Sequence, residues 1–339
     1  MATNPNNTVY IDININIQNV THFQQYEYMG KIIYIMGETH NIVSVECPNP
    51  ITVAQYISIA LLTNDKADVI AEQTSFGKLE GLISSNIIST YETIKSSALI
   101  PEERYKYGEY RPYFLQVGLT YLFYAPNDRI GKKSIRNIIN YFIEPFFNKQ
   151  KLFNYETKVF SNLQEKVKKG IKEVKQQIYD DFVSIKRQLE LREIFEQNFE
   201  NTKDIINDVN TIERIKRENF QKKLDFINRI RFLWVRVNDS FILPDLFDTT
   251  QSETFLLIGS HHSKNLMNIF LFFNQQMNIP INMLQYNENP NGCINVSKPI
   301  SLYGENIRSK LREIEAIENK VEYTDDENEI IRLLRTIEL

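Results

Sequence analysis

The chain has 339 residues, of which 42% are hydrophobic and 24% charged, and its formal net charge is −4. This composition is sufficient for a large hydrophobic core, arranged as one α/β domain with insertions or as two domains. Charges of both signs are interspersed, which argues against a nucleic-acid binder that needs a basic surface. The two cysteines, Cys47 and Cys293, are too few for a disulfide framework, and no CxxC pair suggests a zinc knuckle.

The chain shows no targeting or membrane signal. Its first seven residues contain no basic region followed by an apolar run, and its longest apolar stretches are too short to span a bilayer. We therefore expect a soluble protein without a membrane span, located in the reducing cytoplasm. Heavy use of Asn, Ile, Lys and Tyr is typical of AT-rich genomes, including large DNA viruses, phages and some bacteria. For a viral protein the expected compartment is the host cytoplasm.

The first part of the chain predicts strands with a helix between two of them. Residues 9–17 alternate between apolar and polar side chains, which predicts a half-buried strand near a sheet edge. Residues 31–36 are a continuous apolar run, as in a strand covered on both faces. A helix is predicted over 52–62, and a short buried strand over 67–71 ends at Glu72. This order predicts a βαβ unit in which the two buried strands adjoin and run parallel.

The middle of the chain predicts long helices. Residues 100–126 are rich in tyrosine and contain three prolines, which predicts a loop with a helix over 114–123. From 156 onward, apolar positions recur in steps of three, four and four residues, so one apolar stripe follows a nearly straight helix. A break near Asn201 or Thr202, either of which can serve as an N-cap, predicts a return helix. The stripe positions are Phe160, Leu163, Val167, Ile171, Val174, Ile178, Phe182, Ile185 and Leu189.

The last third predicts a buried strand over 254–258, a helix over 265–277, short strands over 282–286 and 293–296, and two charged helices after 304. We therefore predict an α/β fold: a mainly parallel sheet with flanking helices, a long antiparallel helical hairpin insertion and a helical C-terminal tail. The predicted segments are 1–155 and 238–302 for the two parts of the α/β domain, 156–237 for the helical hairpin, and 303–339 for the tail.

Three of the four histidines lie in two motifs at predicted strand ends, residues 37–40 (Gly-Glu-Thr-His) and 259–262 (Gly-Ser-His-His). Parallel sheets place ligands beyond the carboxyl ends of their strands. Gly37 and Gly259 would each permit a tight turn there, and Glu72 should reach the same edge. The residues expected to converge in one pocket are Glu38, His40, Glu72, His261 and His262.

Two imidazoles and two carboxylates support three kinds of chemistry. They can hold a divalent metal that activates water, act directly through a histidine base, or ligate a cofactor such as haem. The spacing does not separate these, because Glu38-x-His40 is too short for a helical HExxH metal motif. Taken alone, His40 is equally well explained as a hydrogen-bonded polar residue at a strand end. His261 is expected to face away from His262, because neighbours on an extended strand point in opposite directions.

The motifs over 37–41 (Gly-Glu-Thr-His-Asn), 69–72 (Val-Ile-Ala-Glu) and 257–262 (Leu-Ile-Gly-Ser-His-His) carry a family resemblance. They resemble the signatures of the superfamily that includes TraB and Tiki proteins, ChaN-like haem-binding lipoproteins and erythromycin esterases. The likeness spans roughly residues 30–290 and depends on the paired Gly-x-x-His motifs with a glutamate between them. The residues at 263–265 depart from the family pattern, and so does the extra imidazole before the last motif histidine.

The resemblance implies a site and leaves the reaction open. Tiki proteins are metal-dependent proteases, erythromycin esterases hydrolyse a lactone with a histidine base, and ChaN binds haem. By this likeness His40, Glu72 and His262 would be catalytic, and Arg236 would bind an anionic group of the substrate. The implied cofactor is a divalent metal ion (Zn²⁺ or Mn²⁺), with haem as the alternative, or none at all. The implied metal or cofactor ligands are Glu38, His40, Glu72, His261 and His262.

The leading hypothesis is a hydrolase in which histidine and glutamate, with or without a metal ion, activate water for attack on an ester or amide. Its substrate would be a small molecule or a peptide. The first alternative is a haem- or metal-binding protein of the ChaN-like type without turnover. The second is a catalytically retired viral or phage interaction protein, with the helical hairpin as a surface for homo-oligomerisation. None of these hypotheses includes a nucleic-acid partner.

Overall fold

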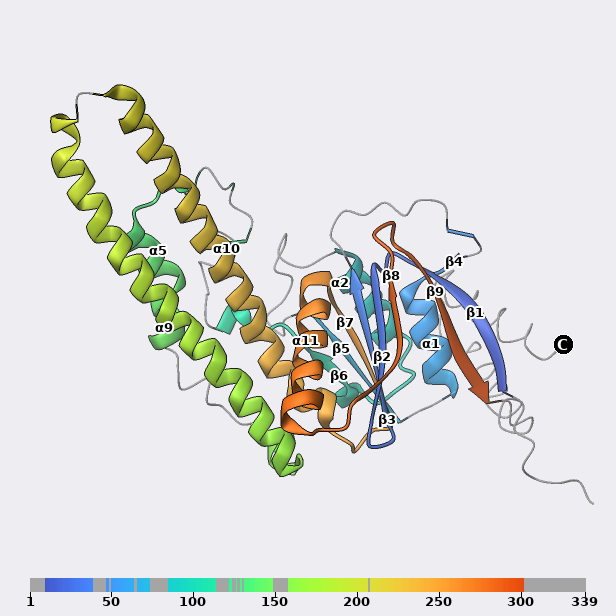
Figure 1. Ribbon diagram of the computed structural model, residues 1–339. Helices are drawn as coiled ribbons and strands as arrows, with labels where there is room; N and C mark the ends of the chain where they lie inside the picture. Colours follow the sequence, from blue (N-terminus) through green and yellow to red (C-terminus); the bar gives the residue numbers. More distant parts are fainter. Residues whose placement is uncertain are drawn as a thin grey trace, which may run out of the picture.

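The computed structural model describes residues 10–38, 47–48, 50–63, 66–73, 85–113, 122–123, 126, 129, 131–148, 158–206 and 208–301. These residues form a mixed α/β structure with two sheets and two long helices that extend away from them (Figure 1). The expected α/β class is therefore confirmed. The predicted tail over 303–339 and most of the helix predicted over 114–123 lie outside the described residues.

The larger sheet has six strands in the order β6-β5-β7-β3-β2-β8. Its strands are β2 (His22–Tyr28), β3 (Lys31–Glu38), β5 (Ala67–Ala71), β6 (Tyr105–Tyr107), β7 (Glu253–Gly259) and β8 (Asn282–Glu288). β6, β5, β7 and β3 run parallel, whereas β2 is antiparallel to both of its neighbours. The expectation that β3 and β5 adjoin is wrong, because β7, from the last third of the chain, pairs with both of them.

Two strands of this sheet, β2 and β6, were not expected from the sequence. β2 is joined to β3 by a tight turn in which Met29 and Gly30 have φ of 51° and 79°. This turn aligns Tyr28 with Lys31, so the polar segment before it becomes a strand by pairing with the apolar β3. β6 lies in the tyrosine-rich segment predicted as a loop, and it pairs in parallel with β5. Strand pairing therefore outweighed weak local propensity at both places.

The smaller sheet has the order β4-β1-β9. Its strands are β1 (Tyr10–Gln18), β4 (Pro50–Ile51) and β9 (Cys293–Ser301). The alternating segment at the amino end is thus the central strand of a separate sheet, and not an edge strand as expected. Asn16 on β1 bonds to both sides: its side chain donates to Pro48 O at 2.6 Å and accepts from Asn295 Nδ2 at 2.9 Å.

A disulfide bond joins Cys47 to Cys293, with an S–S distance of 2.03 Å and a sequence separation of 246 residues. Cys47 precedes β4 and Cys293 begins β9, so the bond links the two outer strands of the smaller sheet. Disulfides are rare in reducing compartments. The pairing therefore does not support the reducing compartment that was expected from the low cysteine count.

Helices cover the six-stranded sheet (Figure 1). α11 (Ser260–Met277) contacts β3 and β7, while α2 (Ser85–Ser96) contacts β5, β7 and α1 (Val53–Thr63). The predicted helix over 52–62 is confirmed as α1. α11 begins five residues earlier than predicted, directly after Gly259, so both histidines of the second motif lie in its first turn. No helix in the described ranges combines the length and the apolar character that crossing a bilayer requires.

The long helices are α9 (Glu165–Thr202) and α10 (Val209–Phe247), which run in opposite directions along one another (Figure 1). All nine predicted stripe positions are buried. Within this core Phe182 stacks on Phe146 of α6 (Glu144–Asn148) with ring centroids 4.1 Å apart, and it meets the edge of Trp234. α5 (Ile135–Phe142) packs on α9, and α8 (Lys158–Asn162) packs on α10.

The ends of α10 differ from the prediction. Its N-cap is Asp208, whose side chain accepts from Asn210 N, because α9 continues through Thr202 and is followed by a 3₁₀ turn over Lys203–Ile205. At its other end α10 continues without a break to Phe247, past Pro244. The predicted boundary between 237 and 238 therefore falls inside a continuous helix, and α10 reaches from the helical pair into the α/β body.

We predict that reduction of the Cys47–Cys293 bond lowers the free energy of unfolding by about 2–5 kcal/mol, because the bond closes a very long loop in the unfolded chain. Urea unfolding of the wild type with and without reductant measures the difference. A Cys47→Ala/Cys293→Ala variant is the control, and reductant should leave its stability unchanged. Equal stability of the oxidised and reduced wild type would contradict the prediction.

Candidate functional site

Four parallel strands end at one edge of the six-stranded sheet, and carboxylates lie at or just after the ends of three of them. β3 ends at Glu38, β5 is followed by Glu72, β6 by Glu109, and β7 ends at Gly259, where α11 begins. The register pairs Glu38 with Gly259, and the Glu72 amide donates to the carbonyl of Leu257 on β7 at 2.8 Å. The carboxylates that follow β3 and β5 therefore flank the amino terminus of α11.

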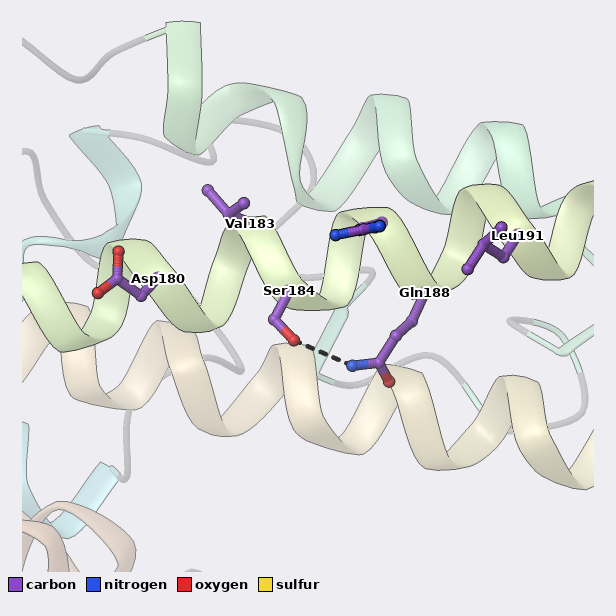
Figure 2. Close-up of a pocket in the computed structure, with 6 residues that line it drawn as sticks. Asp180, Val183, Ser184, Gln188 and Leu191 are labelled. Atoms are coloured by element: carbon purple, nitrogen blue, oxygen red, sulfur yellow. Dashed lines mark hydrogen bonds between the residues drawn. The ribbon is translucent and has the colours of Figure 1, made fainter.

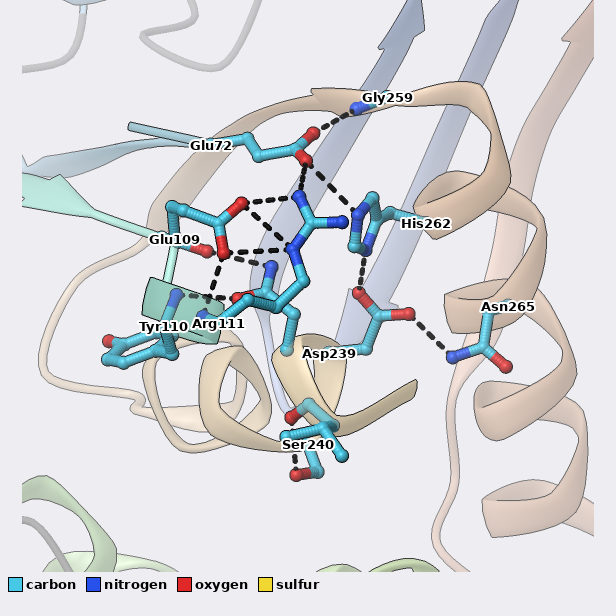
Figure 3. A network of polar contacts seen from close by, with 12 residues as sticks. Glu72, Glu109, Tyr110, Arg111, Asp239, Ser240, Gly259, His262 and Asn265 are labelled. Atoms are coloured by element: carbon cyan, nitrogen blue, oxygen red, sulfur yellow. Dashed lines mark hydrogen bonds and ion pairs between the residues drawn. The ribbon is translucent and has the colours of Figure 1, made fainter. Parts of the chain in front are cut away.

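Glu72 is the centre of a buried polar network at this edge (Figure 3). Its Oε2 accepts from the Gly259 amide at 2.7 Å, and its Oε1 accepts from Arg111 Nη2 at 2.5 Å and lies 3.1 Å from His262 Nε2. Burial alone would raise the pKa of Glu72, but His262 and Arg111 hold it well below its usual range. Glu72 is therefore an ionised carboxylate with partners at both oxygens.

His262 lies between two carboxylates. Its Nδ1 is 2.5 Å from Asp239 Oδ1, and its Nε2 is 3.1 Å from Glu72 Oε1. Burial alone would lower the pKa of His262, but these two carboxylates raise it to about 10. At neutral pH the ring is therefore an imidazolium that donates through both nitrogens, with no lone pair for a proton or a metal ion.

α10 contributes two fully buried polar residues to the network, Asn238 and Asp239. Asp239 Oδ2 accepts from Asn265 Nδ2 at 2.5 Å. Burial raises the pKa of Asp239, and the adjacent His262 opposes that shift. Asn238 donates to Gly108 O at 3.0 Å and accepts from the Tyr110 amide at 2.7 Å, which ties α10 to the end of β6.

Arg111 joins two of the carboxylates. Its Nε lies 2.9 and 3.0 Å from the two oxygens of Glu109, and its Nη2 contacts both Glu109 and Glu72. Burial would lower the pKa of Arg111, but Glu109 and Glu72 outweigh that effect and raise it. The network therefore alternates in charge, with Arg111 and His262 as the cations between three carboxylates.

Glu38 differs from these paired groups. Its side chain is buried, and its Oε1 has no hydrogen-bond partner among the residues that the structure describes. Burial, and then the charge of Glu72, raise the pKa of Glu38 to about 8. An unpartnered carboxyl that titrates near neutral pH, beside a fixed ionic network, is typical of a proton-transfer site. The amide oxygen of Gln73, next to Glu72, is likewise buried without a partner among the described side chains and backbone groups.

The structure brings three of the sequence-predicted site residues, Glu38, Glu72 and His262, to this edge, whereas His40 lies outside the described residues. His261 is exposed in the first turn of α11. It does point away from His262, as expected, but the reason is helical geometry and not the alternation of an extended strand. Arg236 pairs with Asp181 on α9 and does not join the network.

The motif glycines Gly37 and Gly259 make room for neighbouring side chains. The expectation that each permits a tight turn is wrong. Neither has a positive φ, and φ at Gly259 is −66°. A Cβ at Gly37 would lie 2.8 Å from Ser263 Cβ, so this glycine lets α11 pack closely on β3. A Cβ at Gly259 would lie 3.3 Å from Glu72 Oε2, so this one makes room for the carboxylate.

Five members of the network were not identified from the sequence: Glu109, Arg111, Asn238, Asp239 and Asn265. One signal was present, because Asn238-Asp239-Ser240 interrupts an otherwise apolar helical stretch, and buried polar residues need partners. Arg111 gave no comparable signal, since its role depends on the placement of β6.

The residues of the network fit a metal ion poorly. Both nitrogens of His262 and both oxygens of Glu72 already have partners. Across the part of the chain that the structure describes, no group of three or more His, Cys, Asp or Glu side chains could hold a metal ion. The network is thus a set of ion pairs in its own right.

Comparison of the chain with protein-family models, curated proteins and solved structures gives no match. The resemblance to the TraB, Tiki and erythromycin esterase superfamily therefore depends on the motif residues alone. Any function has to be argued from the geometry at the strand ends.

We predict that Arg111→Met lowers the free energy of unfolding by about 3–5 kcal/mol, because it leaves Glu72 and Glu109 buried without their shared cation. Arg236→Met is the matched control, since the partly exposed pair with Asp181 should contribute only about 0–1 kcal/mol. Urea unfolding of both variants measures the difference. Equal losses in the two variants would show that the buried network is not the stabilising one.

We predict a pH dependence of stability from Glu38. The pKa of Glu38 is about 8 in the folded protein and near 4.5 when unfolded, so stability is lost as the pH rises between these values. The pKa of His262 is about 10 in the folded protein and near 6.5 when unfolded. Its contribution therefore also lowers the stability as the pH rises, but only above about pH 6.5. Because of Glu38, the free energy of unfolding should therefore fall by about 1–2 kcal/mol as the pH rises from 5 to 6.5.

Glu38→Gln should remove that loss, so the difference in unfolding free energy between variant and wild type should grow from pH 5 to 6.5. Urea unfolding at the two pH values measures it, and groups common to both proteins cancel. A difference that does not change with pH would contradict a raised pKa at Glu38.

Proposed function

We propose that this protein is a hydrolase that acts on an ester or amide carbonyl at the carboxyl edge of the six-stranded sheet. The observation that carries the proposal is Glu38. Its carboxyl group is buried with one oxygen that has no hydrogen-bond partner in the described ranges, and its pKa is about 8. The motif resemblance to esterases and proteases of the TraB, Tiki and erythromycin esterase superfamily supports the same reaction class.

In this proposal ionised Glu38 accepts a proton from water, and the water oxygen attacks the carbonyl carbon. A base whose pKa lies near the working pH is present in the correct form and still drives the transfer. The proton then passes from Glu38 to the leaving alcohol or amine as the tetrahedral intermediate breaks down. This restores the ionised carboxylate for the next turnover.

The ionic network would act through position and charge. Glu72 is held by Arg111, His262 and the Gly259 amide, so its negative charge beside Glu38 is fixed. The amino end of α11 lies at this edge, and the positive end of its macrodipole favours the developing oxyanion. His262 is then a positioning residue for Glu72. This role replaces that of general base, which the motif alone suggested for His262.

His40 keeps the role that the resemblance implies for it. It follows Glu38 by two residues in the sequence, and in the related families this histidine takes a proton or binds a metal ion. A divalent metal ion bound through it would polarise the carbonyl or activate the water. The substrate in this proposal is a small ester or amide, or a peptide.

We predict that the wild type hydrolyses members of a panel of p-nitrophenyl esters and peptide p-nitroanilides, with kcat/KM rising around pH 8 as Glu38 ionises. Glu38→Gln should lower kcat/KM by about 10²–10⁴-fold. Glu218→Gln, an exposed carboxylate on α10, is the matched control and should leave the rate unchanged.

Circular dichroism confirms that each variant is folded, and a parallel series with chelator shows whether a metal ion takes part. Full activity in folded Glu38→Gln would refute the role of Glu38. No turnover of any substrate by the wild type would count against the hydrolase proposal itself.

A further inference from the structure

We infer that two copies of this chain associate through the outward face of α9, with the two α9 helices antiparallel about a two-fold axis. This inference concerns assembly and is independent of the proposed hydrolase activity. It depends on the charges and the open groove that α9 presents opposite its buried stripe.

The outward face of α9 carries a second apolar row. Val183, Leu191 and Ile194 are 42%, 62% and 55% exposed, whereas the stripe positions on the other side are buried. Together with Arg187 they follow steps of four, four and three residues, which places them on one face of the helix. Figure 2 shows the groove along this face. Its lining residues are Asp180, Val183, Ser184, Arg187, Gln188 and Leu191.

The charges in this groove are self-complementary. Asp180 and Arg187 lie seven residues apart on the same face, and both are exposed. Within the described part of the chain, Arg187 has neither an ion-pair nor a hydrogen-bond partner. In an antiparallel pair that sets Asp180 of one copy opposite Arg187 of the other, the two-fold axis generates the same ion pair twice. Val183 then lies beside Ser184 of the second copy, next to the axis.

The antiparallel direction follows from the same two charges. A parallel arrangement in register would instead place Asp180 beside Asp180 and Arg187 beside Arg187, where like charges repel.

We predict that the full-length protein dimerises, and that Arg187→Glu or Asp180→Arg each weakens dimerisation on the order of tenfold or more. The double exchange Asp180→Arg/Arg187→Asp should restore it, because both ion pairs reappear with their signs reversed. Arg217→Glu, an exposed charge reversal on α10, is the control and should leave the dimer intact. Sedimentation velocity over a range of concentrations measures each dissociation constant.

A cysteine at the axis tests the register. Val183→Cys should give a covalent dimer on mild oxidation, because residues 183 and 184 of the two copies lie side by side, whereas Gln197→Cys should not. A wild type that stays monomeric at every concentration would overturn the inference. So would a dimer that tolerates both single reversals, or a double exchange that fails to restore association.

Discussion

The alternating ion pairs around Glu72 are the constraint on which the rest of the structure depends. Glu72 accepts from the amide of Gly259 and contacts the imidazolium of His262 and the guanidinium of Arg111. One carboxylate therefore links the ends of β5, β6 and β7. Asp239 extends the chain of charges into α10. Each of these groups would be costly to bury alone, and each is satisfied only when the others are in place. The network therefore specifies how helices and strands meet at this edge.

That constraint also decides which group is chemically available. A histidine held between two carboxylates stays protonated, so His262 stabilises its neighbours and does not accept a proton. Within the described part of the chain Glu38 has no comparable partner, and burial raises the pKa of its carboxyl group to about 8. The contrast between a saturated network and one unsaturated carboxyl beside it is the physical basis of the proposed hydrolase. Environment, more than residue type, assigns the roles.

α10 connects the two functional proposals. Its carboxyl-terminal half contributes Asn238 and Asp239 to the network, and its amino-terminal half packs along α9, whose outward face is the inferred dimer surface. Because α10 is continuous, one helix joins the packed core of the helical pair to the strand ends. Phe182 and Trp234 form the centre of that core.

The sequence alone determined the features that arise from local periodicity and strand-end motifs. These are the buried runs that became β3, β5 and β7, the apolar stripe of α9, and the placement of Glu38, Glu72 and His262 at one edge. Tertiary structure alone decided that β7 lies between β3 and β5, that Arg111 and not Arg236 joins the network, and that Cys47 pairs with Cys293. The physical reason is that periodicity is a property of neighbouring residues. Strand order, ion-pair partners and the protonation state of a buried histidine depend on groups that are far apart in the chain and meet only on folding.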